Sequence, residues 1–152
     1  MVHEERRALV QDLQALEPPN WQTPSLCPDW DVHDVLAHLV DTAKTTRRSF
    51  IGGMLGARFD FDRDDAMGVM RERAEDPGAT LAEFSTVLTR TSTPPAALTT
   101  RLVEAFVHGE DIRRPLDDEL NRLVPVERGL HRLDSCRAVG EPRRTHRRCA
   151  RR

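Results

Sequence analysis

The chain has 152 residues, of which 38% are hydrophobic and 32% charged, which suits one domain with a modest core. Its net charge of -2 hides an asymmetry, because residues 128–152 hold nine arginines but two acidic residues, so the overall charge predicts no particular partner. No apolar run could span a membrane, and the charged segment 1–16 is unlike a signal peptide, so we expect a cytoplasmic protein. Three cysteines without C-x-x-C spacing indicate neither a disulfide framework nor a thiolate zinc site.

The first half of the chain shows hydrophobic residues at helical spacing in two long stretches. Residues 3–16 form an amphipathic stretch that two prolines end, and a proline-rich connector follows. Asp31 with Asp34 resembles the capping arrangement of a helix start, which predicts a second helix over 31–55. Its apolar spacing places His33 on the solvated side.

Three further helices are expected after residue 65. Residues 66–75 form a short helix, and Thr80 caps the third main helix. The fourth begins at residues 93–95 and is ended by Pro115. Its core-facing side chains are expected to be Leu98, Leu102 and Phe106, with Val103 and Val107 beside them.

The whole pattern predicts an all-α fold, because no stretch alternates with the two-residue period of a strand. Four main helices and one extra short helix, joined by short connections, indicate a four-helix bundle over residues 1–116. Residues 117–152 are rich in arginine and lack a period, so we expect a disordered tail. Such a tail could attract nucleic acid, but without interleaved aromatic residues a solvated tail is the better interpretation.

Glu104, His108 and Asp111 share one face of the last helix, at spacings typical of metal ligands. A glutamate and a histidine four residues apart also arise by chance on amphipathic helices. His38, within the apolar pattern of the second helix, could complete a set of three ligands with an open position, as in catalytic zinc sites, although nickel or iron would accept the same residues. Asp111 and Asp34 could accept hydrogen bonds from the two imidazoles, and Asp34 could equally serve only the helix start.

Catalytic residues cannot be assigned from the sequence. Cys27 precedes a proline in the connector, and nothing basic is near it in sequence, so we interpret it as a small buried residue rather than a nucleophile. The oligomeric state and the identity of the substrate likewise have no signal in the pattern of residues.

Two motifs together resemble a known family. They are Leu26-Cys-Pro-Asp-Trp30, followed by Asp34-Val-Leu-Ala-His-Leu39, and Glu104-Ala-Phe-Val-His-Gly-Glu-Asp-Ile-Arg-Arg-Pro115. Both are similar to the N-terminal domain of mycothiol-dependent maleylpyruvate isomerases, within the DinB-like superfamily, over residues 3–116. The resemblance implies a helical bundle with a divalent metal, usually zinc, at His38, Glu104 and His108, and the thiol mycothiol as cosubstrate.

The resemblance ends where that family continues into a smaller α/β domain, since an arginine-rich segment like a shifted or truncated reading frame follows Leu116. We therefore expect a metal-dependent thiol enzyme domain that transfers a thiol, or adds it to an electrophilic substrate as an isomerase does, without the second domain needed for full isomerase activity. The alternative is a non-catalytic metal-binding or interaction domain, a truncated remnant. Nucleic-acid binding is the weakest hypothesis.

Overall fold

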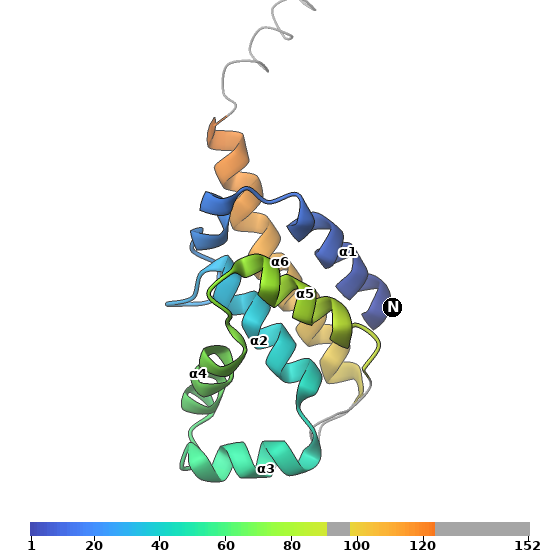
Figure 1. The fold of residues 1–152 in the computed structure, drawn as a ribbon, viewed down its shortest axis with the longest axis vertical. Helices are drawn as coiled ribbons and strands as arrows, with labels where there is room; N and C mark the ends of the chain where they lie inside the picture. The colour runs from blue at the N-terminus through green and yellow to red at the C-terminus, as the bar shows by residue number, and fades with distance from the viewer. Residues whose placement is uncertain (91–97, 124–152) are drawn as a thin grey trace, which may run out of the picture. The chain divides into compact units, whose positions relative to one another are not determined.

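A computed structural model describes residues 1–90 and 98–123, and the regular structure within these ranges is helical (Figure 1). This confirms the predicted all-α class. Residues Met1–Asp118 form one compact unit. None of the described helices is both long and apolar enough to cross a bilayer. The helices are α1 (Val2–Gln14), the 3-10 helix η1 (Pro18–Gln22), α2 (Val32–Lys44), α3 (Arg47–Gly56), α4 (Phe61–Glu72), α5 (Pro77–Val87) and α6 (Leu98–Leu123).

Two sequence predictions fall outside these ranges. They are the start of the last helix at residues 93–95 and the disorder expected of the tail beyond residue 123.

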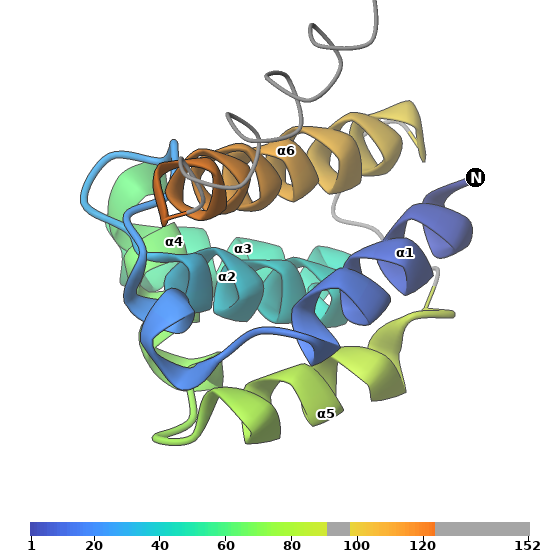
Figure 2. The ribbon, with the colours of Figure 1, turned by 90° about the horizontal axis from the view of Figure 1, so that it is seen from above.

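The helix α2 lies at the centre of the bundle, between α5 and α6 (Figure 2). Nine of its thirteen residues are buried, two of them histidines, which is the pattern of a helix covered on several sides. It packs against α4 and α5, and α1 packs against α5. The core therefore forms around α2, and its fully buried members include Val32, Val35, Leu36, Leu39 and Val40 of α2, Leu9 and Leu13 of α1, Phe84 and Val87 of α5, and Ile112 of α6.

The start of α2 is a reciprocal capping box, as predicted. The Asp34 backbone N–H donates to Asp31 Oδ1 at 2.8 Å, and the Asp31 N–H donates to Asp34 Oδ2 at 3.1 Å. Arg73, just after α4, donates to both carboxylates, at 2.9 Å to Asp31 Oδ1 and 2.6 Å to Asp34 Oδ1. The helix-start interpretation of Asp34 is therefore confirmed.

We expect Asp31→Ala to lower the free energy of unfolding by roughly 0.5–2 kcal/mol, because the cap oxygen that accepts the Asp34 N–H is lost. Urea denaturation followed by circular dichroism would measure it. The matched control is Asp117→Ala, at an exposed aspartate of α6, which should change stability by less than about 0.5 kcal/mol. Equal losses in both variants would contradict the capping role.

The predicted helix over 31–55 is wrong in one respect, because the chain forms two helices there. α2 ends at Lys44, and Thr45 and Thr46 are extended, with ψ of 125° and 168°. The Thr46 hydroxyl accepts from the Ser49 N–H at 3.2 Å, and the Thr46 N–H donates to the Ser49 hydroxyl at 2.7 Å. This second capping box satisfies the free amides of α3, so the chain can turn here without leaving them unpaired.

The next two helices begin at other residues than predicted. α4 starts at Phe61 rather than residue 66, with Asp60 accepting from the Arg63 N–H at 3.1 Å. α5 is capped by Asp76 instead of Thr80.

Thr80 lies buried inside α5, where its hydroxyl is 2.8 Å from His33 Nε2. The solvated position predicted for His33 is therefore wrong. A hydrogen bond between two helices satisfies this histidine in the interior, and no pattern within α2 alone could indicate it.

Pro115 does not end the last helix as predicted, because α6 continues to Leu123. The disorder expected from residue 117 onward is therefore wrong for residues 117–123, which are helical. Proline has no N–H, so the helical bond to the carbonyl four residues earlier, that of Asp111, is missing. The Leu26 N–H donates to this carbonyl at 3.2 Å instead. The proline thus leaves the Asp111 carbonyl oxygen free to accept a hydrogen bond from the connector before α2, which links that connector to α6.

The buried side of α6 also differs from the prediction. Val103, Phe106 and Val107 are exposed, and Leu102 is half-buried; the Leu98 side chain is not described. The helix instead buries Arg101, Ala105, Ile112 and Leu116. The side of α6 that faces the bundle therefore also carries Glu104 and His108. The apolar spacing predicted the wrong face because the side that is buried contains charged and polar residues, Arg101 among them.

Candidate metal centre

Two of the three predicted ligands, from motifs about 70 residues apart, meet between α2 and α6. The His38 and His108 rings have centroids 5.0 Å apart and cross at 82°. His38 is only 6% exposed, and the Trp30 ring packs against it, with the two ring centroids 5.1 Å apart. A metal held between two helices of the bundle requires two histidines that meet in this way. The assignment of His38 and His108 as metal ligands stays a prediction.

Two buried side-chain atoms here have no hydrogen-bond partner among the described residues: His38 Nδ1 and Glu104 Oε1. Buried polar atoms are normally paired, because leaving one unpaired costs roughly 1–3 kcal/mol. An imidazole nitrogen and a carboxylate oxygen are both lone-pair donors that zinc and similar divalent cations bind. The residues present therefore fit a metal ion.

His38 titrates far from its ordinary range. Burial, followed by the nearby His108, lowers the pKa of His38 to about 4. The ring is thus neutral near pH 7, which is the form that binds a metal.

His108 is oriented by Asp111 on the next turn of α6. Its Nδ1 lies 3.1 Å from Asp111 Oδ2, so a protonated Nδ1 donates there and Nε2 is left for another partner. Cys27 joins the pair, its Sγ 3.3 Å from Asp111 Oδ2 and 3.7 Å from His108 Nδ1. Asp111 therefore makes the contact expected of a residue that supports a metal-binding imidazole.

Cys27, His108 and Asp111 also form the one group of three possible ligands in the described ranges whose donor atoms all lie within 4.8 Å of one another. The donor atoms of His38, Glu104 and His108 are not that close together, so side-chain movement would have to bring them onto one ion. Burial and then Asp111 raise the pKa of the Cys27 thiol to about 11, so the neutral thiol predominates at pH 7 and is a weak ligand and nucleophile.

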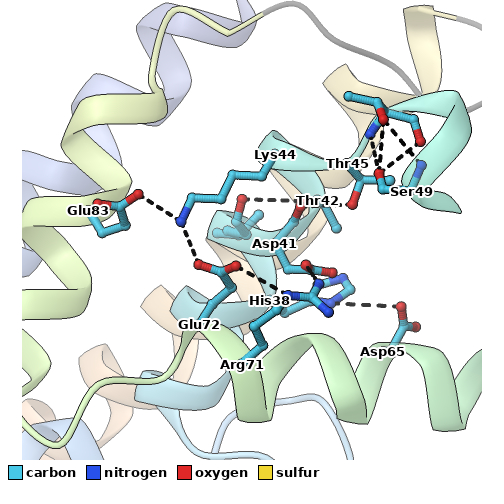
Figure 3. Close-up of polar contacts among 12 residues, drawn as sticks. His38, Asp41, Thr42, Lys44, Thr45, Ser49, Asp65, Arg71, Glu72 and Glu83 are labelled. Carbon is cyan, nitrogen blue, oxygen red and sulfur yellow. Dashed lines mark hydrogen bonds and ion pairs between the residues drawn. The ribbon is translucent and has the colours of Figure 1, made fainter. Parts of the chain in front are cut away.

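Asp65 on α4 is the residue at this site that the sequence analysis missed. Its Oδ1 lies 3.9 Å from His38 Nδ1, and the two side chains face each other in Figure 3. Burial, followed by the charges of Asp64, Asp41 and Asp62, raises the pKa of Asp65 to about 6. The helix predicted from the sequence begins only at residue 66, and only the packing of α4 against α2 shows which of its aspartates faces the histidine.

The sequence pattern predicts for Cys27 only a small buried side chain, whereas the structure places its Sγ beside His108 and Asp111. Its only signal was the Leu-Cys-Pro-Asp-Trp motif, and it reaches His108 because the Leu26 N–H bonds to α6. Asp34, one turn before His38, accepts from the Asp31 N–H with Oδ2 and from Arg73 with Oδ1, so both of its oxygens serve the helix start.

We expect Asp111→Asn to weaken zinc binding about 10- to 100-fold, because the amide no longer supplies the charge that holds the His108 Nδ1–H. Competition with a fluorescent zinc chelator would measure the affinity. Glu110→Gln, at the preceding position, is the control, since Glu110 pairs with Arg114 on the surface. An unchanged affinity in Asp111→Asn would show that Asp111 does not support a ligand.

The fold and the site together define a helical bundle with a candidate metal centre between two of its helices. The family model described as the mycothiol maleylpyruvate isomerase N-terminal domain matches residues 2–92, more than half of the chain, and the chain belongs to this family. The match confirms the resemblance seen in the motifs; it includes His38 and ends before Glu104 and His108. Neither the curated proteins nor the solved structures contain a match.

Proposed function

We propose that this chain is a divalent-metal-binding domain that works with the thiol mycothiol, its metal held by His38, Glu104 and His108. Membership of the mycothiol maleylpyruvate isomerase N-terminal domain family supports mycothiol as the thiol with which the domain works. The observation that supports the metal is a pair of buried atoms without a hydrogen-bond partner among the described residues, His38 Nδ1 and Glu104 Oε1. The His38 ring lies against the ring of His108, and Glu104 is one helical turn before His108 on α6. Zinc is the first candidate because it combines readily with imidazole and carboxylate ligands.

The chemistry follows from what such a centre supplies. A divalent metal, when bound, acts as a Lewis acid that lowers the pKa of a coordinated thiol, so that a thiolate is available near neutral pH. The chain's own residues prepare the place for it. Trp30 and the His108 ring cover His38 and keep water away, Asp111 fixes the tautomer of His108, and Glu104 contributes negative charge.

The thiolate of mycothiol would add to an electrophilic carbon of a small substrate. The sulfur electron pair would form the C–S bond while the electron pair of the substrate's double bond moves onto a conjugated carbonyl oxygen, giving an enolate. Protonation of the enolate would complete the thiol transfer. Expulsion of the thiolate after rotation about the former double bond would restore that bond, which is the isomerase-like outcome. The three ligands leave one position open to the thiol, the arrangement of catalytic rather than structural zinc sites.

The experiment has two stages. The full chain is purified without chelators or a metal-affinity tag, and its metal content is measured; we expect about one divalent ion per chain. Zinc-loaded and metal-stripped protein are then compared in mycothiol-dependent assays with maleylpyruvate and with a general electrophile, glutathione serving as the control thiol. Loss of thiol consumption on stripping, with restoration by zinc, is the expected result.

A second candidate function is metal binding without catalysis. The grouping of Cys27, His108 and Asp111 favours it, because an ion held by this set would occupy His108 and leave the set of His38, Glu104 and His108 incomplete. Metal-loaded protein that consumes no thiol with either electrophile would favour this alternative. Protein that neither contains nor takes up a divalent metal would overturn both functions.

A further inference from the structure

An aspartate of α4 lies opposite the unpaired histidine nitrogen. His38 Nδ1 is buried and accepts or donates no hydrogen bond among the described residues, and it points at Asp65 Oδ1 (Figure 3). The two atoms are 3.9 Å apart, beyond the 2.7–3.2 Å or so of a hydrogen bond to nitrogen. Two donor atoms on one tetrahedral zinc ion, each bound at about 2.1 Å, are separated by about 3.4 Å. The observed separation is closer to that of two ligands of one ion.

Asp65 also shares a cavity with Glu104. Both side chains line a space of about 110 Å³ between α2, α3, α4 and α6, which exceeds the roughly 10–15 Å³ that a cavity needs to hold one water molecule. Glu104 Oε1 is the second buried atom without a hydrogen-bond partner. One carboxylate from α4 and one from α6 therefore reach a space that is large enough for an ion.

The other aspartates near this cavity have different surroundings. Asp41 is paired with Arg71, and its carboxylate lies against the α-carbon side of Gly68. Asp64 lies against Gly53, a position where a larger residue would collide with its carboxylate. Among these aspartates, Asp65 is the one whose carboxylate oxygen lies 3.9 Å from His38 Nδ1, a buried nitrogen without a hydrogen-bond partner among the described residues, which is a distance that a shared metal ion could bridge.

Asp65 also reaches the outside. It lines an open groove of about 390 Å³ together with Cys27, Trp30 and Asp62, so the same side chain borders the inner cavity and the outer groove. Its side chain is 49% exposed, whereas that of His38 is 8% exposed. A carboxylate in this position can face the metal centre, and a molecule that enters the groove from solvent can displace it.

We propose that Asp65 is a fourth protein ligand of the metal centre, joining His38, Glu104 and His108; this rests on the proposed function. While no thiol is bound, Asp65 would take the fourth position of the tetrahedral site, the one that the other three ligands leave open, and an arriving thiol would replace it there. Asp65 is the ligand at the groove, and it is the one that gives way.

The test compares Asp65→Asn with Asp62→Asn in the full chain. Asp62 lies one turn earlier on α4 and lines the same groove, which makes it a matched carboxylate. We expect Asp65→Asn to weaken zinc binding about tenfold or more and Asp62→Asn to change it less than about twofold. The visible absorption of the cobalt-substituted protein, which reports the ligands around the ion, should change in Asp65→Asn and stay as in the wild type in Asp62→Asn.

Unchanged zinc affinity and an unchanged cobalt spectrum in Asp65→Asn would overturn the assignment. If His108→Ala abolishes binding in the same experiments, the proposed metal function stands while the role of Asp65 fails. If neither variant alters zinc binding, both fail. Circular dichroism of the metal-free proteins checks folding, and Asp65→Ser replaces Asp65→Asn if that variant is misfolded.

Discussion

His108→Ala is expected to lower the zinc affinity of the chain by more than about 100-fold, a larger loss than removal of a supporting residue causes. His108 contacts His38 across the α2–α6 boundary, and its Nδ1 is already held by Asp111, so its other nitrogen is the ligand the centre would lose. Glu104→Ala should have an effect of similar size, because it removes both a ligand and a negative charge. Zinc titration against a competing chelator, together with metal analysis of the purified variants, measures the loss.

The controls for these variants come from the same chain. Glu110→Ala removes another glutamate of α6, one that is 46% exposed and paired with Arg113 and Arg114, and it should leave zinc affinity unchanged. His131→Ala, outside the described residues, should also have no effect. Equal metal content in the wild type and His108→Ala would contradict the ligand assignment.

Phe84→Ala should reduce the free energy of unfolding by about 3–5 kcal/mol. Phe84 has no exposed surface and is the largest fully buried side chain in the described ranges, where α5 packs on the central α2. Its truncation leaves a cavity that the surrounding helices can fill only in part. Urea denaturation of the metal-free proteins measures the effect without a contribution from metal binding.

Phe59→Ala is the matched control, because Phe59 lies between α3 and α4 and is 71% exposed. We expect a change within about 0.5 kcal/mol. A loss in Phe84→Ala no larger than that in Phe59→Ala would mean that the packing of α5 on α2 contributes little to stability.

The local pattern of the chain was enough to predict the fold class and the start of α2. Hydrophobic spacing identifies helices because burial requires one apolar face, and the capping box of Asp31 and Asp34 acts over three residues. The break at Thr45 and Thr46 escaped prediction because nothing between Asp31 and Leu55 disfavours a helix strongly enough to end it. At Pro115 the usual rule for prolines failed, since the acceptor it frees is used by the distant Leu26 N–H.

The sequence by itself determined which residues of α6 and α2 are candidate ligands, because Glu104 and His108 are one helical turn apart and His38 stands in a family motif. Only the tertiary structure decided which of these atoms lack partners and what else reaches them. Asp65 and Cys27 arrive from α4 and from the connector before α2, and no spacing within either segment points to His38 or His108. The physical reason is that helix periodicity relates residues within a turn or two, whereas a metal site is made by side chains whose proximity depends on how separate helices pack.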